Sequence, residues 1–383
     1  MAFTRREFGQ LAIAGLPMAL FLDTPLVAGQ KKPNSKVGGV QLGVITYSYR
    51  SMPDQSAEAT LRYIIDSGLS ATELMDGPVE NFLGRPQAAA ARGGGGAGGG
   101  RGGGRGGDAP AAAAPAPQTP YEQLMAGTMP SCAPNPEPAP AAAAAGGRGR
   151  GDARGGPTPE AQAAADELRK WRTSVSMDKV KQLRRMYNDA GVTIYAYKAD
   201  GLQKNLQTTD EELEYLFSVT AALGATHTTM ELPAPGADGT AMLKRMAAFA
   251  ARHKVFIAYH THAQGSMTVF DEALAMSTWN RSNVDLGHYV AAGNNGGSPL
   301  QFLEKHHARI ASFHLKDRTL PAHCSLYVPF GMGDGQIKDI LLLMKKRRWT
   351  FPATIELESP IPSGSDAVKE VAKCVTFARG VLA

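Results

Sequence analysis

Cysteine is scarce in this sequence and forms no recognisable pattern. Among the 383 residues there are three cysteines, Cys132, Cys324 and Cys374. Their spacing fits no zinc-binding motif, and one of the three stays unpaired in any disulfide scheme. We therefore expect the cysteines to be bystanders.

Net charge is also lacking in the part of the chain that can fold. The formal charge is +5, but residues 1–36 carry +3 of it and residues 84–160 carry the other +2. Because the remainder is about neutral, the sequence does not support a basic groove for nucleic acid, and no nucleic-acid partner is expected.

The apolar run near the N-terminus is too short to cross a bilayer. It covers residues 11–22, about twelve residues, which is the length of a signal-peptide core. Before it stands Thr4-Arg5-Arg6-Glu7-Phe8, which resembles the twin-arginine export signal. We expect residues 1–30 to be a signal peptide, the twin-arginine export machinery to be a partner, and the protein to be periplasmic. A cut after Ala28 would place Leu26 where a small residue is preferred, so a retained leader that anchors the protein to the membrane stays open, as does an ordinary amphipathic N-terminus.

Residues 84–160 contain almost nothing that can be buried. Gly, Ala, Pro and Arg dominate the stretch, and such a composition favours disorder. Arg-Gly repeats can bind RNA, but a solvated insertion suits an exported protein better. Without the insertion and the leader roughly 275 residues remain, the size of one (β/α)₈ barrel. The predicted organisation is a signal peptide at 1–30 and a barrel at 38–383 that is interrupted by 84–160.

The remaining sequence alternates between strand and helix patterns. Eight apolar, β-rich runs are predicted strands: 40–47, 70–75, 192–198, 226–232, 255–262, 283–287, 310–316 and 353–358. Eight amphipathic stretches are predicted helices: 57–68, 158–190, 209–223, 240–253, 268–278, 299–306, 336–347 and 365–382. Alternation implies a parallel sheet, and eight repeats close a barrel, so an α/β fold of the (β/α)₈ TIM-barrel type is predicted. A doubly wound open sheet is the alternative.

Ionisable residues end the last five predicted strands, where a barrel of this type has its active site. They are Glu231, His260 and His262, Asp285 and His288, His314 with Lys316 and Asp317, and Glu356 with Glu358. Carboxylates and imidazoles suit Mn²⁺ or Mg²⁺, with Co²⁺ or Zn²⁺ as alternatives. Residues two apart share a face of a strand. In the pairs 260/262, 314/316 and 356/358 we therefore expect the deeper residue to bind metal and the shallower one to contact substrate.

These motifs resemble those of the sugar phosphate isomerase/epimerase family, within the xylose isomerase-like TIM-barrel superfamily. The likeness rests on Asp285-Leu-Gly-His288, His314-Leu-Lys-Asp317, Ile355-Glu356-Leu-Glu358, Met230-Glu231-Leu232 and His260-Thr-His262. The resemblance implies one divalent ion, Mn²⁺ above all, bound by Glu231, Asp285, His314 and Glu356. It also implies that Glu231 and Glu356 act as the acid/base pair.

Substrate contacts are implied for His262, His288, Lys316, His260 and Glu358. Two assignments stay open: Glu358 can replace Glu356 as ligand, and either Lys316 or Arg318 can be the family's basic substrate residue. Asp317 points away from these pairs, so we expect it to support its neighbours or cap a helix.

The predicted function is that of a metal-dependent isomerase or epimerase acting on a ketose or keto-sugar by proton abstraction next to a carbonyl. The alternatives are a lyase or hydratase with the same barrel and metal site, an enzyme like endonuclease IV, and a non-catalytic sugar-binding barrel. A homo-oligomer is left open.

Three further features allow two interpretations each. The glycine-rich stretches 293–297 and 331–335 precede predicted helices and can either cradle a phosphate or serve as loops and helix caps. Tyr195 and Tyr197 either line the substrate pocket or pack in the interior.

Overall fold

A computed structural model describes residues 32–86, 118–132, 158–202, 208–262 and 264–383. The predicted leader and the stretches 87–117 and 133–157 lie outside these described residues. Residues from Pro33 to Ala383 belong to one compact unit. Within the described ranges, no helix combines the length and the apolar character that a membrane crossing requires.

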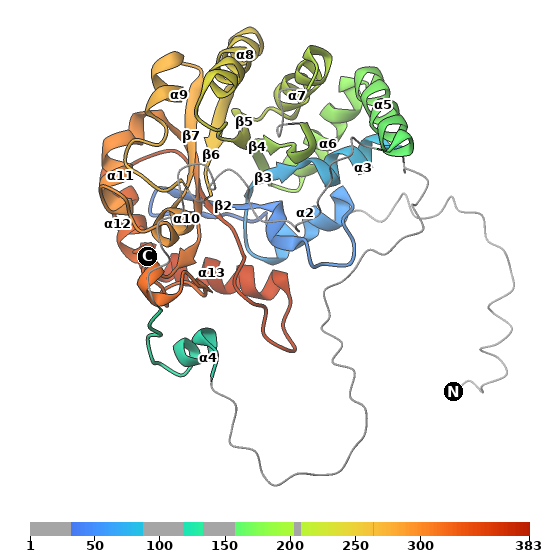
Figure 1. Ribbon diagram of the computed structural model, residues 1–383. Coiled ribbons are helices and arrows are strands. Elements are labelled where there is room, and N and C mark those ends of the chain that lie inside the picture. The colour runs from blue at the N-terminus through green and yellow to red at the C-terminus, as the bar shows by residue number, and fades with distance from the viewer. Residues whose placement is uncertain (1–31, 87–117, 133–157, 203–207, 263) are drawn as a thin grey trace, which may run out of the picture. The chain divides into compact units, whose positions relative to one another are not determined.

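Eight parallel strands close into a barrel, because β2 pairs with both β3 and β11. The strands are β2 (Val40–Ile45), β3 (Ala71–Met75), β4 (Thr193–Lys198), β5 (His227–Glu231), β6 (Phe256–His260), β7 (Asn280–Asp285), β8 (Ile310–Leu315) and β11 (Ala353–Ile355). Figure 1 shows these strands at the centre with helices around them. The predicted TIM barrel is confirmed.

Helices follow the strands and cover them. They are α2 (Ala57–Asp66), α3 (Asp76–Leu83), α5 (Pro159–Ser174), α6 (Met177–Asp189), α7 (Asp210–Leu223), α8 (Ala237–His253), α9 (Asp271–Met276), α10 (Leu286–Ala291), α11 (Pro299–His306), α12 (Ile337–Arg347) and α13 (Ala367–Leu382). Single turns of 3₁₀ helix are η1 (Thr46–Tyr49), η2 (Asp200–Leu202), η3 (His307–Arg309) and η4 (Pro321–His323). The apolar faces of the long helices and both faces of most strands are buried, as a barrel with an outer helical ring requires.

Helix boundaries follow local capping chemistry. Helix α7 begins with a capping box, in which the Thr209 side chain accepts from the Glu212 N–H and the Glu212 side chain accepts from the Thr209 N–H. It ends at Gly224, whose φ of 72° lies in the left-handed region that glycine adopts without strain. The predicted helix 209–223 is therefore confirmed to within a residue.

Several predicted elements were wrong in extent; for example, the last strand ends at Ile355 instead of 358, and helix α9 covers 271–276 instead of 268–278. The single helix expected at 158–190 is interrupted at Val175, because Ser176 caps a new helix, α6, with its side chain. The sixth strand runs from Asn280 to Asp285 instead of 283–287, because the Asp285 side chain accepts the His288 N–H and starts helix α10. Helix α3 was not predicted.

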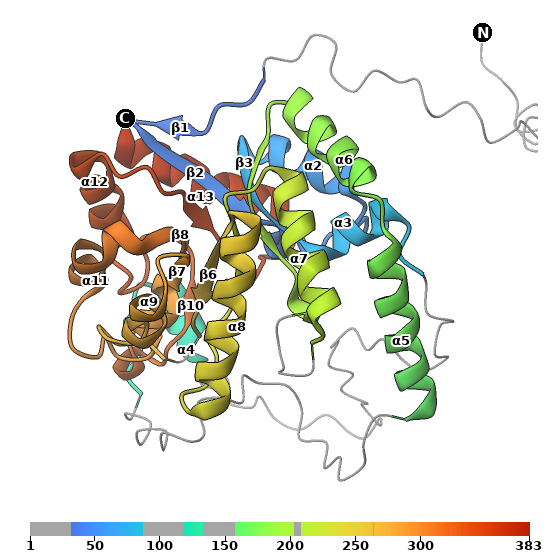
Figure 2. The same ribbon diagram turned by 90° about the horizontal axis from the view of Figure 1, so that it is seen from above.

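The N-terminal end of the barrel is covered by a hairpin. Strand β1 (Lys36–Val37) turns back onto β2 through Gly38 and Gly39, whose φ values of 56° and 86° favour glycine. In Figure 2 strand β1 lies beside the C-terminus of the chain. A Cβ at Gly38 would be 2.8 Å from the Leu382 carbonyl oxygen. The hairpin thus occupies the end of the barrel opposite to the predicted site.

A buried ion pair joins the two flanks of the insertion. Glu80 on α3 accepts from Arg172 on α5 at 2.8 and 3.4 Å, and both side chains are almost completely buried. Arg85 and the Tyr215 hydroxyl also contact the Glu80 carboxylate. The barrel is therefore continuous across the insertion, because residues 92 positions apart in sequence meet in its wall.

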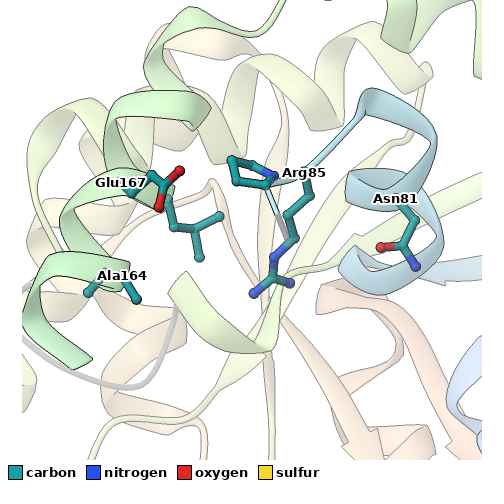
Figure 3. A pocket seen from close by; sticks show the side chains of 7 residues that line it. Asn81, Arg85, Ala164 and Glu167 are labelled. Atoms are coloured by element: carbon teal, nitrogen blue, oxygen red, sulfur yellow. The ribbon is translucent and has the colours of Figure 1, made fainter. Parts of the chain in front are cut away.

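A hollow of about 430 Å³ lies beside this ion pair (Figure 3). It is lined by Asn81, Arg85, Pro86, Ala164, Ala165, Glu167 and Leu168. The lining contains no imidazole and none of the predicted site residues. We therefore do not place the functional site there.

Part of the insertion is ordered and covalently attached. Helix α4 (Pro120–Met125) begins with a capping box at Thr119, and Cys132 forms a disulfide with Cys324. The prediction of a structureless insertion is wrong for residues 118–132, and the view of the cysteines as bystanders is wrong for this pair. The sequence could not show the pairing, because the two cysteines are 192 residues apart and meet only after the barrel has formed. Cys374 is free and buried.

We predict that Glu80→Gln destabilises the protein. The substitution removes the nearest charge partner of the buried Arg172 and leaves only the more distant Glu212, at 3.8 Å. Loss of a partner costs about 3–5 kcal/mol in comparable buried pairs. The free energy of unfolding in urea measures the effect. The control is Glu304→Gln, which breaks the exposed pair with Arg347 and should change that free energy by less than about 1 kcal/mol. Equal effects of the two substitutions would contradict the role of the buried pair.

Candidate functional site

The C-terminal ends of the barrel strands bring the predicted residues together in one mouth. Glu231 ends β5, His260 ends β6, Asp285 ends β7, His314 lies in β8 and Glu356 follows β11. The imidazole ring centroids of His260 and His314 are 4.5 Å apart. His262 bridges the mouth, with ring centroids 4.9 Å from His260 and 4.8 Å from His288.

Lys316 lies at the centre of the carboxylates. Its Nζ is 2.9 Å from Asp285 Oδ2 and 2.8 Å from Glu356 Oε2, and it also pairs with Glu358. Burial lowers the pKa of Lys316, but the three carboxylates outweigh this and raise it above the ordinary value. A Cβ at Gly287 would lie 2.8 Å from Lys316 Cγ, so the glycine leaves room for this lysine. Lys316 is therefore a fixed positive charge in the mouth.

His314 is held between two glutamates. Its Nδ1 lies 2.9 Å from Glu356 Oε2 and its Nε2 lies 3.1 Å from Glu73 Oε2. Although burial lowers the pKa of His314, these carboxylates raise it well above the ordinary value. Burial acts to raise the pKa of Glu73, yet His314 and Lys198 bring it down to about 2. Glu73, His314 and Glu356 therefore form one buried hydrogen-bonded group.

Glu73 and Lys198 belong to the site but were missing from the predicted set. Glu73 lies within β3 and Lys198 ends β4. Lys198 Nζ is 3.2 Å from Glu231 Oε1, and Glu231 Oε2 is 2.8 Å from His262 Nδ1. Burial raises the pKa of Glu231, but Lys198 and the histidines lower it below its ordinary range. The strand-end rule applied to the third strand would have found Lys198.

His260 is held as a neutral imidazole. Burial lowers its pKa to about 3, with Lys198 adding to the effect. Its Nδ1 lies 2.9 Å from Asn283 Oδ1, and the Asn283 amide nitrogen donates to Ser312 at 2.7 Å. Because Asn283 offers its oxygen, His260 Nδ1 carries the hydrogen. Its Nε2 lone pair is then available to a metal or a substrate.

Two groups of side chains have the spacing of metal ligands. In each group the ligand atoms lie within 4.8 Å of one another: Glu231 with His260 and His262, and His260 with Asp285 and His314. The structure does not bring the predicted set of Glu231, Asp285, His314 and Glu356 into one such group. His260 belongs to both groups, although a substrate contact was predicted for it.

The donors of the mouth fit a divalent cation. Glu73 Oε1 and Asp285 Oδ2 are buried without a hydrogen bond, even though Oδ2 lies close to Lys316 Nζ. The mouth contains more carboxylates than lysines, which favours an added positive charge. The carboxylates are those of Glu73, Glu231, Asp285, Glu356 and Glu358, and the lysines are Lys198 and Lys316. Oxygen and imidazole donors are those that Mn²⁺, Mg²⁺, Co²⁺ and Zn²⁺ accept in proteins.

Depth separates the members of two strand-end pairs, 260/262 and 356/358, whereas His314 and Lys316 are both buried. His260 is buried whereas His262 is exposed, and Glu356 is more deeply buried than Glu358. Glu356 contacts both His314 and Lys316. Glu358 contacts Lys316 and lies 3.8 Å from His288. Of the two glutamates left open as ligands, Glu356 is the one adjacent to His314.

Arg318, two residues after the buried Lys316, is partly exposed. It is part of the two-stranded ribbon of β9 (Asp317–Arg318) and β10 (Tyr327–Val328). Its guanidinium donates to His288 Nδ1 at 2.8 Å and lies 4.0 Å from the centroid of the Tyr327 ring. Burial lowers the pKa of His288 to about 2, aided by Lys316 and Arg318. His288 is therefore a neutral ring in contact with two cations.

Asp317 turns away from the mouth and organises the glycine-rich loop 331–335. Its carboxylate accepts from the N–H groups of Gly331, Gly333 and Gly335 at 2.8, 3.1 and 3.0 Å. Burial raises the pKa of Asp317, although the three donors oppose this. The phosphate-cradle interpretation of this loop is wrong, because the donors are already used within the chain.

The second glycine-rich stretch is also explained by local structure. Ser298 and Gln301 form a capping box at the start of α11, which uses the backbone donors there. Both tyrosines pack in the interior: the Tyr195 hydroxyl donates to Thr354 at 2.8 Å, and Tyr197 is completely buried. Neither tyrosine lines the mouth.

We predict that Asp317→Asn loosens the loop 331–335. An amide offers one acceptor where the carboxylate offers two, so at least one buried N–H loses its partner at a cost of about 1–3 kcal/mol. Urea unfolding and amide hydrogen exchange at the three glycines measure the change. Asp178→Asn, at an exposed residue of α6, should leave both unchanged. Protection of the loop by added inorganic phosphate in the wild type would instead support a phosphate cradle.

Comparison with known proteins agrees with this fold. The model of the xylose isomerase-like TIM barrel family matches residues 160–376. No curated protein matches the sequence. D-psicose 3-epimerase with D-tagatose from Clostridium cellulolyticum H10 superposes with a TM-score of 0.51 at 8% identity, covering 90% of this chain and 99% of that one. A xylose isomerase domain protein from Alicyclobacillus acidocaldarius subsp. acidocaldarius gives a TM-score of 0.50 at 10% identity, with coverage of 90% and 99%. Since the family model spans more than half of the chain, this protein belongs to the xylose isomerase-like TIM barrel family.

Proposed function

We propose that this protein is a divalent-metal-dependent isomerase or epimerase that acts on a ketose or keto-sugar. The observation that carries the proposal is the pair of ionised carboxylates Glu231 and Glu356, which adjoin the group of His260, Asp285 and His314: Glu231 has ligand spacing to His260, and Glu356 Oε2 lies 2.9 Å from His314 Nδ1. Proton removal next to a carbonyl needs a base, and its return to another position or face needs an acid. Two such groups in one mouth meet both needs.

The family resemblance assigns the metal to Glu231, Asp285, His314 and Glu356. Asp285 and His314 form a group of ligand spacing with His260, and Glu231 forms another with His260 and His262, so His260 would join the ligands. When bound, a divalent cation polarises a carbonyl and stabilises the negative charge that develops on it. The donors fit Mn²⁺, which the family resemblance favours, and also Mg²⁺, Co²⁺ and Zn²⁺.

The chain's own residues supply proton transfer and orientation. Lys198 keeps Glu231 ionised, and Lys316 with His314 keeps Glu356 ionised, so both can accept a proton from substrate carbon. Lys316 places a permanent positive charge where an oxygen of the substrate gains negative charge. His288 is neutral and can hydrogen-bond a sugar hydroxyl. We assign contacts with the outer part of the substrate to His262, which is exposed at the mouth, and to Glu358, which lies 3.8 Å from His288.

We predict that Glu356→Gln abolishes proton exchange while the protein stays folded. An amide cannot accept the proton and is a weaker metal ligand than a carboxylate, so the loss should be at least about 10²–10⁴-fold. The assay loads the protein with Mn²⁺ and follows deuterium entry from D₂O into a panel of ketoses and 3-keto-glycosides by mass spectrometry. Circular dichroism checks the fold, and Glu304→Gln serves as the unaffected control.

Metal content distinguishes the two glutamates. Glu358→Gln should retain the Mn²⁺ stoichiometry of the wild type, whereas Glu356→Gln should lose metal; the reverse would transfer the ligand role to Glu358.

Full exchange activity in Glu356→Gln would reject its role as a base. An unsaturated product without exchange would indicate a lyase, and no reaction with any sugar would favour a binding protein.

We also propose that the protein is exported to the periplasm. Two observations support this: the twin-arginine-like sequence at Arg5 and Arg6, and the Cys132–Cys324 disulfide. Disulfides persist in oxidising compartments and are rare in the cytosol.

Replacing both arginines by lysine should leave the protein in the cytoplasmic fraction, because the export receptor reads the arginine pair. Immunoblotting of cell fractions measures the distribution. Replacing Lys31 and Lys32 by arginine is the matched control and should not change it. Identical distributions of all three proteins would contradict this route, and wild-type protein in the membrane fraction would indicate a retained leader.

A further inference from the structure

The loop between β9 and β10 has an unusual backbone. Two consecutive residues, Cys324 and Ser325, have φ values of 73° and 49°, in the left-handed region that non-glycine residues rarely occupy. Such a backbone persists only where surrounding contacts hold it. Here the contacts within the loop include the Ser325 N–H to the Leu320 carbonyl at 3.1 Å and the Thr319 hydroxyl to the His323 carbonyl at 2.7 Å.

This loop contacts Arg318, a residue of the barrel mouth. The Ser325 carbonyl accepts from the Arg318 guanidinium at 2.6 Å, and the other guanidinium nitrogen contacts His288 Nδ1. Tyr327, the first residue after the loop in β10, stacks on Arg318. The Ser325 hydroxyl donates to the Ala291 carbonyl at the end of α10, the helix that carries His288. Hydrogen bonds therefore connect the loop backbone to Arg318 and, through Arg318 and helix α10, to His288.

The disulfide attaches the segment 118–132 to the same loop. Cys324 is one of the two residues with positive φ, and the Cys132 N–H also donates to the Ala322 carbonyl at 2.9 Å. Apart from this link, the segment has little that fixes it to the barrel, since Leu124 and Pro130 are its buried residues. Two apolar side chains do not offset the conformational entropy lost on ordering a segment of this length. The covalent bond is thus the main attachment.

We propose that the Cys132–Cys324 disulfide is a positioning element of the mouth, which keeps the loop 319–326 in the conformation that orients Arg318 toward His288. A dithiol reductant opens it: the S–S bond takes up two electrons and two protons, giving two cysteine thiols, and the reductant becomes a disulfide. The segment 118–132 then detaches, the loop relaxes from its positive-φ conformation, and the contact between Arg318 and His288 loosens. The catalytic importance of that contact rests on the proposed function, but the structural coupling does not.

The test compares wild type, wild type treated with dithiothreitol, Cys132→Ser and Cys374→Ser. Cys132→Ser leaves the sequence of the loop intact, and Cys374→Ser is the matched control because that thiol is buried in α13 and unpaired. Amide hydrogen exchange followed by mass spectrometry reports on the segment and the loop. The ¹⁵N imidazole resonances of His288, assigned from a His288→Gln spectrum, report on the mouth without any substrate.

Reduction and Cys132→Ser should each accelerate exchange about tenfold or more both in 119–132 and in 319–326. Both should also shift the His288 resonances, while Cys374→Ser does neither. Faster exchange confined to 119–132, with His288 unchanged, would overturn the proposal and leave the disulfide as an anchor of the insertion alone. Because neither readout uses a sugar or a metal, failure here is distinct from failure of the proposed isomerase activity.

Discussion

The mouth of this barrel depends on the ion pairs that Lys316 makes with three carboxylates. Asp285, Glu356 and Glu358 would repel one another at this separation, and the burial of Asp285 and Glu356 would drive their protonation without a nearby cation. The ammonium keeps Asp285 and Glu356 ionised, and Lys198 does the same for Glu231. The acids remain deprotonated and therefore suited to accept protons or bind a cation.

The barrel topology explains why these charges can be gathered at all. In a closed parallel sheet the strand ends converge, so each strand contributes one or two side chains to a shared space. Local structure then fixes their direction: Asp285 both ends β7 and caps α10, which points His288 into the mouth. Asp317 uses its carboxylate on the loop 331–335 and so anchors the strand end that carries Lys316 and Arg318.

The long insertion is compatible with the barrel because its two flanks are joined independently of it. Glu80 and Arg172 close the wall across the gap, and the disulfide fastens one ordered piece to the loop after β9. The piece is thereby connected to Arg318 and His288, on the substrate side of the mouth. An insertion that looks like a spacer in sequence is thus linked to the site through the loop 319–326.

The sequence by itself determined the eight strands, their parallel order and most of the ionisable residues at their ends, because the strand and helix periodicities and the abrupt change from apolar to charged residues are local signals. Only the tertiary structure decided which of them touch. Glu73 contacts His314 across 241 positions, Lys198 pairs with Glu231, His260 joins two groups of ligands, and Cys132 finds Cys324. Contacts of this kind leave no periodic trace along the chain, since they are set by how the closed barrel places distant strand ends and loops side by side.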